Sequence, residues 1–141
     1  MGFISNQTGE LISDIEHQMM SRAYQAAQAL KKAELQVLRG QGGGRRYRVP
    51  GTGASYTASA PGQPPAVRTG AYRSSYAPRA EQKSGNVYRS LIESGLSVNG
   101  WNLGNLLENG TSKMAPRPHD ERIIQKALPE ISRIYNRPFM R

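Results

Sequence analysis

The N-terminal segment has the apolar spacing of one long amphipathic helix. Asn6 or Thr8 can cap its start and Gly40 can end it, so we expect the helix over residues 1–39. The apolar positions recur every three or four residues, as they do on one face of a helix: Leu11, Ile12, Ile15, Met19, Ala23, Ala26, Ala27, Leu30, then Ala33 or Glu34, and Val37 or Leu38.

This helix is long for a single domain of 141 residues. At a rise of 1.5 Å per residue, about 30 helical residues span about 45 Å. We therefore expect part of the helix to contact another subunit. The alternative is a bent helix that wraps around its own core.

The helical spacing stops at residue 40, and seven of residues 40–64 are glycine. Within this stretch, Tyr47 and Val49 alternate with Arg46 and Arg48, and a Pro-Gly turn signal follows, which predicts an extended β-hairpin. A flexible Gly-rich loop is the alternative. Because an isolated hairpin is marginal in water, we expect it to order against a neighbouring chain. The glycines lack the G-x-x-x-x-G-K-[ST] pattern of a phosphate-binding loop.

Residues 65–141 predict a small sheet and short helices. Thr69 can cap a short helix that runs through Tyr76, with residues 71–75 inside it, and an edge or half-buried strand is expected around residues 87–92. A second short helix is expected over residues 103–108, closed by Asn109-Gly110 in left-handed geometry.

The last expected helix spans residues 119–135, with a kink or break near Pro129. Trp101 is expected to be a core or interface anchor. The buried stripe of the last helix is expected to comprise Ile123, Ile124, Ala127, Leu128, Ile131 and Ile134. The whole chain is therefore expected to form one α+β domain over residues 1–141, with a long N-terminal helix, a small antiparallel sheet with a hairpin loop, and a C-terminal helix.

Charge is unevenly distributed. The chain has 19 Lys and Arg against 10 Asp and Glu, and residues 40–89 hold eight bases but a single acid, Glu81. Such a patch attracts phosphate or acidic protein surfaces, although a solubilising loop is the alternative. The candidate interface residues are Arg45, Arg46, Tyr47, Arg48, Arg68, Arg73, Lys113 and Arg117.

The types and spacing of the polar residues give little support for catalysis. The chain has no Cys, and its two histidines, His17 and His119, lack a metal-ligand spacing. Glu108 could pair with Asp120 or Glu93, and Ser74 or Ser75 could use His119 as a base, but the spacing supports neither arrangement. We expect no enzyme, cofactor or metal site. No apolar run approaches the roughly 20 residues that span a bilayer, so we also expect no membrane span.

Two segments carry short motifs. The first, "APGQPPAVRTGAYRSSY", contains a Pro-Gly-x-Pro-Pro run followed by Thr-Gly and a basic helix: Pro61, Gly62, Pro64, Pro65, Thr69, Gly70, Arg73 and Ser75. The second, "LLENGTSKMAPRPHDERIIQKALPEI", places an acid before Gly-Thr-Ser-Lys-Met and two prolines: Glu108, Gly110, Thr111, Ser112, Lys113, Met114, Pro116 and Pro118.

In this order, and together with the long first helix, the two motifs resemble the tail-completion or neck proteins of long-tailed bacteriophages, also called minor tail components. The chain departs from that family at Asn109, where many members have an aromatic residue, and at His119-Asp120, where many have an apolar pair. The resemblance covers nearly the whole chain.

The resemblance implies a structural virion protein, assembled in the host cytoplasm, that forms a ring of six copies where tail joins head. Its implied partners are further copies of itself, the tail-terminator protein and the head-completion or connector proteins. It also implies that Gly110 forms a corner that aims Met114 and the last helix onto the sheet.

The alternative function is a small basic nucleic-acid-binding protein. Arg45, Arg46 and Arg48 surround Tyr47, so they could hold phosphates while the ring stacks on a base. No signature of a known DNA- or RNA-binding module accompanies them. In a neck ring the same residues could contact packaged DNA.

Overall fold

The computed structural model describes residues 2–39, 43–44, 46–48, 51, 53, 55–66 and 70–139. Its helices and strands, in chain order, are α1 (Gly2–Val37), β1 (Arg46–Arg48), β2 (Ser55–Thr57), α2 (Ala71–Ser75), β3 (Tyr76–Ser84), β4 (Val87–Ser94), β5 (Ser97–Val98), β6 (Trp101–Asn102), α3 (Leu103–Asn109) and α4 (Asp120–Asn136).

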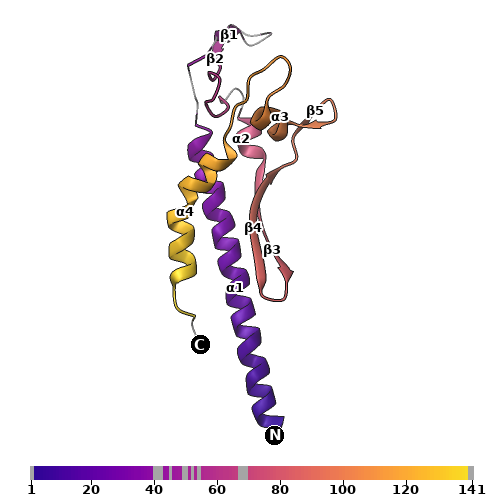
Figure 1. Ribbon diagram of the computed structural model, residues 1–141, viewed down its shortest axis with the longest axis vertical. Helices are drawn as coiled ribbons and strands as arrows, with labels where there is room; N and C mark the ends of the chain where they lie inside the picture. Colours follow the sequence, from indigo (N-terminus) through magenta and orange to yellow (C-terminus); the bar gives the residue numbers. More distant parts are fainter. Residues whose placement is uncertain are drawn as a thin grey trace.

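The long helix α1 is the axis of the fold. Figure 1 shows α4 along one side of it and the β3–β4 hairpin along the other, with β1 and β2 near its C-terminal end. The N-terminal turns of α1 extend beyond both the hairpin and α4. This arrangement confirms the expected α+β class with a long N-terminal helix, antiparallel pairing and a C-terminal helix.

The core is small because alanine dominates it. Ala33 of α1 packs against Ile123 and Ala127 of α4, and all three are buried. Six of the nine fully buried apolar residues in the described part of the chain are alanine. Since alanine has only a methyl side chain, α1 and α4 can approach closely, but little apolar surface is buried in return.

The C-terminal end of α4 is held to α1 by a buried arginine. The Arg22 guanidinium donates to the carbonyl oxygens of Tyr135, at 3.0 Å, and Pro138, at 2.9 Å. It also lies 4.2 Å from the centroid of the Phe139 ring, where a cation is attracted by the ring face. These contacts satisfy carbonyls that the end of a helix leaves without partners.

The β3–β4 hairpin supplies the second surface packed on α1. Its antiparallel register runs from Tyr76 opposite Ser94 to Ser84 opposite Val87. The expected strand over residues 87–92 is confirmed and extends to Ser94, whereas β3 was not predicted. Pro78 and four charged or amide side chains hide β3 from a strand pattern, and an edge strand tolerates them because its outer side faces solvent.

Several expectations about the helices need correction. Helix α1 begins at Gly2, so neither Asn6 nor Thr8 caps its start. Helix α4 runs unbroken through Pro129, where the missing N–H removes one hydrogen bond without ending the helix. Helix α4 packs mainly on α1 and not, as expected, mainly on the sheet, although Ile92 of β4 packs against the same cluster of Ala33, Ile123 and Ala127.

Three of the large apolar side chains that this chain leaves exposed bear on the expectations above. Ile124 and Leu128 of α4 are 45% and 46% exposed, so their expected place in the buried stripe is wrong. Ile124 instead lines the cavity between α1, β4 and α4. Trp101 is 69% exposed, so the core alternative is wrong and the interface alternative stays a prediction.

The expected hairpin in the Gly-rich stretch is confirmed for its described strands. β1 pairs antiparallel with β2, and Tyr47 lies opposite Tyr56. Gly40 and Thr69, expected to end one helix and cap another, lie outside the described residues. At the start of α2, Gly70 has a φ of 83°, a conformation that glycine adopts without strain.

Gly110 is predicted to be indispensable for stability. Its φ is 78°, and a Cβ built on it would lie 2.8 Å from Pro116 N and 2.9 Å from Met114 O. Gly110→Val should therefore lower the free energy of unfolding by more than about 2 kcal/mol in urea titration. Gly95→Val is the matched control, since a Cβ at Gly95 meets nothing within 4 Å. Equal urea midpoints for the two variants would show that the turn does not require glycine at position 110.

Candidate functional site

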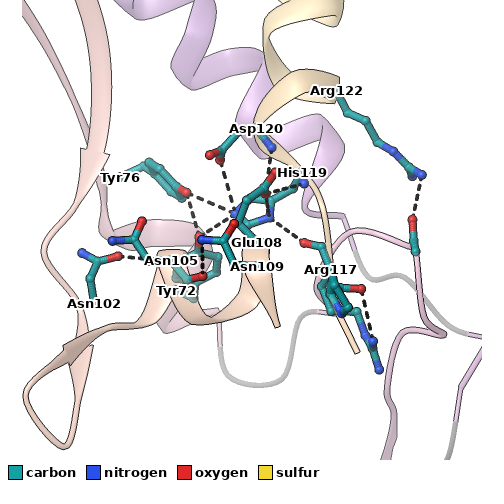
Figure 2. A network of polar contacts seen from close by, with 12 residues as sticks. Tyr72, Tyr76, Asn102, Asn105, Glu108, Asn109, Arg117, His119, Asp120 and Arg122 are labelled. Atoms are coloured by element: carbon teal, nitrogen blue, oxygen red, sulfur yellow. Dashed lines mark hydrogen bonds and ion pairs between the residues drawn. The ribbon is translucent and has the colours of Figure 1, made fainter. Parts of the chain in front are cut away.

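The most concentrated set of interacting polar side chains lies where α2, α3 and α4 meet. We call it the polar corner and define it by Tyr72, Tyr76, Glu108, His119 and Asp120. Figure 2 shows these side chains directed toward one another, from α2, the start of β3, α3 and the start of α4. His119 is 1% exposed, so it lies at the centre of the corner and beneath its surface.

Glu108 joins α3 to the start of α4. Its Oε2 accepts hydrogen bonds from the backbone N–H of His119, at 2.8 Å, and from that of Asp120, at 3.2 Å. The first N–H groups of a helix have no partner within the helix, and the positive end of the helix favours a carboxylate. Glu108 therefore caps α4 from a distance of eleven residues, which explains why an acid stands at this position of the second motif.

His119 connects this cap to two tyrosines. Its Nδ1 lies 2.8 Å from the Arg117 carbonyl and 2.9 Å from Glu108 Oε2; both are acceptors, so Nδ1 carries the hydrogen. Nε2 then accepts from the Tyr72 hydroxyl at 2.7 Å, and the Tyr76 hydroxyl lies 2.7 Å from that of Tyr72. Both ring nitrogens are thus engaged within the protein.

Burial determines the protonation of the corner. Burial and the bond to Tyr76 raise the pKa of Tyr72 well above its ordinary value, and burial raises the pKa of Tyr76 to about 12. Burial and the adjacent Glu108 carboxylate raise the pKa of Asp120. Both phenols therefore remain protonated at neutral pH, as donors to the chain of hydrogen bonds that ends on His119.

Glu108, His119 and Asp120 are the residues here that could hold a divalent cation, because their ligand atoms lie within 4.8 Å of one another. Such binding would require Nε2 of His119 to give up the Tyr72 hydroxyl and Glu108 to weaken the cap of α4. The spacing of Glu108 and Asp120 did not predict that their carboxylates come together, but they do. Glu108 caps the backbone at the start of α4 there. Ser75, which was considered as a nucleophile for His119 and rejected on spacing, donates to the Tyr72 carbonyl at 2.6 Å.

A second buried charge lies beside the corner, on α1. Glu34 is 0% exposed; Lys31 Nζ donates to its Oε2 at 3.2 Å, while its Oε1 has no partner within the described structure. Burial raises the pKa of Glu34, against the opposing effect of Lys31. Its place in the alanine stripe of α1 was left open between Ala33 and Glu34, and both side chains are buried.

The two sequence motifs meet in space. The Gly62 N–H donates to the Pro116 carbonyl at 3.2 Å, and the Arg122 guanidinium donates to the Gly62 carbonyl at 2.8 Å. Arg117 Nε donates to the Ser59 hydroxyl at 3.0 Å. Pro64 and Pro65 are buried at this junction, whereas Pro61 and Gly62 are exposed.

The turn of the second motif is closed by its own backbone. Thr111 N donates to the Met114 carbonyl at 2.9 Å, and Met114 N donates back at 3.3 Å. The Arg117 N–H donates to the Leu107 carbonyl at 2.7 Å, and so ties the segment before α4 to α3. Pro116 closes on Gly110 and Pro118 precedes the cap, so these residues together form the corner that the motif predicted.

The candidate interface residues fall into two groups. Arg46, Tyr47 and Arg48 on β1 are exposed, as is Lys113. Arg73 instead donates twice to the Leu35 carbonyl near the end of α1, at 3.1 and 2.5 Å. Its bonds, like those of Arg117, hold this chain together. Arg45 and Arg68 lie outside the described residues.

Sequence reasoning missed Tyr72, Tyr76 and Arg22. The two tyrosines are four residues apart, as on one helical face, although Tyr76 is already the first residue of β3. A basic residue within the apolar stripe was the only signal for Arg22, whose partners lie 113 and 116 positions away.

No protein-family model, curated protein or solved structure matches this chain. None of the helices in the described part of the chain is both long and apolar enough to cross a membrane.

Loss of the Glu108 cap should destabilise the protein. Glu108→Ala removes the acceptor for two helix N–H groups, so we expect the free energy of unfolding to fall by about 1–2 kcal/mol. Glu121→Ala is the matched control, because Glu121 is also in the first turn of α4 but bonds only to the Gln125 side chain. Urea titrations that give equal losses would contradict the capping role.

Titration of Glu34 should make stability depend on pH in a defined direction. The pKa of Glu34 is higher in the folded protein than its ordinary value of 4.5. Such a group contributes its full stabilisation below the unfolded-state pKa, and that contribution is lost as the pH rises through the folded-state pKa. The stability of the wild type relative to Glu34→Gln should therefore be greatest at about pH 4 and should decline toward about pH 8. Paired urea titrations measure it, and a difference that grows with pH would contradict the assignment.

Proposed function

We propose that this protein is a structural virion protein of a long-tailed bacteriophage, which forms a ring at the head–tail junction, completes the tail and joins it to the head. The ring has six copies, and its neighbours are the tail-terminator and the head-completion or connector proteins. The protein is assembled in the host cytoplasm and is not an enzyme. The two motifs support this proposal, since they resemble those of tail-completion proteins and meet at one junction.

The observation that carries the proposal is the surface left uncovered on a single copy. The chain exposes 9617 Å², about one third more than the roughly 7200 Å² expected for a compact monomer of this mass. Exposed apolar side chains are spread over α1, α4 and the β5–β6 hairpin: Ile12, Ile15, Trp101, Val98, Ile124 and Leu128. Large uncovered apolar areas are typical of subunits that associate.

The internal contacts also fit a protein whose role is geometric. The Glu108 cap, the closed turn at Gly110 and the buried hydrogen bonds of His119 fix α3 relative to α4. His119 is too deeply buried to meet a substrate, because its exposure is 1% and both nitrogens are engaged. A fixed angle between elements serves a ring subunit, which must present two different surfaces to its neighbours.

The location of the protein in particles tests the proposal. A phage carrying this gene with an epitope tag on its product would be grown and purified on a density gradient, and then labelled with gold-conjugated antibody for electron microscopy. We expect gold at the head–tail junction, with untagged particles as the control. Purified particles that lack the protein, or gold confined to the tail tip, would refute the proposed function.

Exposed Arg46, Tyr47 and Arg48 on β1 favour a second candidate, a small nucleic-acid-binding protein. A gel-shift series over increasing salt separates the two. Submicromolar affinity with a steep salt dependence would favour this second candidate. Weak binding by a protein that forms rings would favour the neck role.

A further inference from the structure

The charges of this protein are separated along its long axis. Residues 2–21 contain Glu10, Asp14 and Glu16 and no Lys or Arg. Among the described residues of 35–76, Arg39, Arg46, Arg48 and Arg73 are basic and none is acidic. Figure 1 places the N-terminal turns of α1 at one end of the molecule, and places β1, β2 and α2 at the other. One end is therefore acidic and the opposite end basic.

The acidic end is a helix with an apolar face that this chain does not cover. Ile12 and Ile15 are 53% and 38% exposed, and Met19 continues the same face one turn later. Among residues 12–37 of α1, whose burial is described, the first buried residues are Arg22 and Ala23. A helical segment of this length without packing is marginal in water, so an apolar partner surface would stabilise it.

The basic end contains a groove of suitable chemistry. Its volume is about 490 Å³, and Leu38, Leu96, Leu103, Leu107 and Met114 form its apolar lining. Arg73 and Arg117 also line it, and exposed Lys113 is adjacent to Met114. The larger cavity between α1, β4 and α4 suits an acidic helix poorly, because Glu93 and Asp120 are the charged residues among its described lining.

We propose that the N-terminal turns of α1, residues 2–19, bind the basic end of a second copy, with Ile12 and Ile15 entering the groove lined by Leu103, Leu107 and Met114. An amphipathic helix in an apolar groove is a common mode of recognition. Asp14 and Glu16 then face the cations around the groove. This contact specifies the interface of the proposed ring and rests on that function only in taking the partner to be another copy of this chain.

Charge selects this pairing over the two obvious alternatives. Two N-terminal segments paired with each other would bring like charges together, which is unfavourable. Nucleic acid could bind the basic end but would leave the apolar face of α1 uncovered. A head-to-tail contact satisfies both ends, and it closes into a ring when the rotation between copies allows.

Self-association of the full chain tests the charge argument. In sedimentation equilibrium with nuclease-treated protein, the wild type should associate, and more weakly as salt rises from about 50 to 500 mM. Asp14→Lys with Glu16→Lys should weaken association by at least about tenfold. The control, Glu121→Lys with Glu130→Lys, makes the same charge change on α4 and should weaken it by less than about threefold.

Cysteine cross-linking tests the geometry, because the natural chain has no cysteine. An Asp14→Cys variant mixed with a tagged Lys113→Cys variant should oxidise mainly to the mixed dimer. Lys83→Cys, in the β3–β4 hairpin, replaces Lys113→Cys as the control and should give little mixed dimer.

Four results would overturn the inference: a wild type that stays monomeric, association only with nucleic acid present, no effect of charge reversal, or Asp14–Asp14 dimers as the main product. Particles that carry the protein without the Asp14–Lys113 link would leave the proposed function standing. If the Asp14–Lys113 link forms but purified particles lack the protein, the inference would stand and the proposed function would be refuted.

Discussion

The packing of α4 and the β3–β4 hairpin against the single helix α1 is the constraint on which the rest of this structure depends. Alanines on α1 let α4 approach closely around Ala33, Ile123 and Ala127. The hairpin packs on another side of the same helix, where the Ser90 hydroxyl donates to the Ala23 carbonyl at 2.6 Å. Two layers thus share one central element, and they bury only a narrow strip of each.

The small buried apolar area has consequences at both ends of the molecule. Alanine contributes little apolar area, so much of the stability must come from local devices such as the Glu108 cap and the Arg22 clamp on the end of α4. The large side chains remain on the surface, and α1 continues past its own packing partners. A chain built in this way leaves apolar surface uncovered, and this surface is the basis of the proposed assembly.

The local signals in the sequence predicted α1, α4, the β1–β2 pairing and β4. Each has its own periodicity, and the positive φ at Gly110 followed from a helix-end pattern. Strand β3 was not predictable in this way, because Pro78 and its polar neighbours suppress the alternation and only packing on α1 stabilises it. The exposure of Ile124 and Leu128 was also hidden, since apolar spacing identifies a face but not what covers it.

The polar corner shows a different limit. Glu108 and Asp120 are twelve positions apart, and their meeting depends on the turn between α3 and α4 more than on either residue. The motif indicated that the segment mattered, and the structure supplies a mechanical reason for it: a cap, a closed turn and a buried histidine. These features fix the angle between α3 and α4, in keeping with the proposed role in assembly.

The central claim is that this chain acts as a structural part of a ring. A cryo-electron microscopy reconstruction of the head–tail junction of the phage that carries this gene tests it most directly. The account predicts a closed ring into which this fold fits, with the N-terminal turns of α1 lying on the basic end of the adjacent copy. A junction whose density is fully explained by other proteins would contradict it.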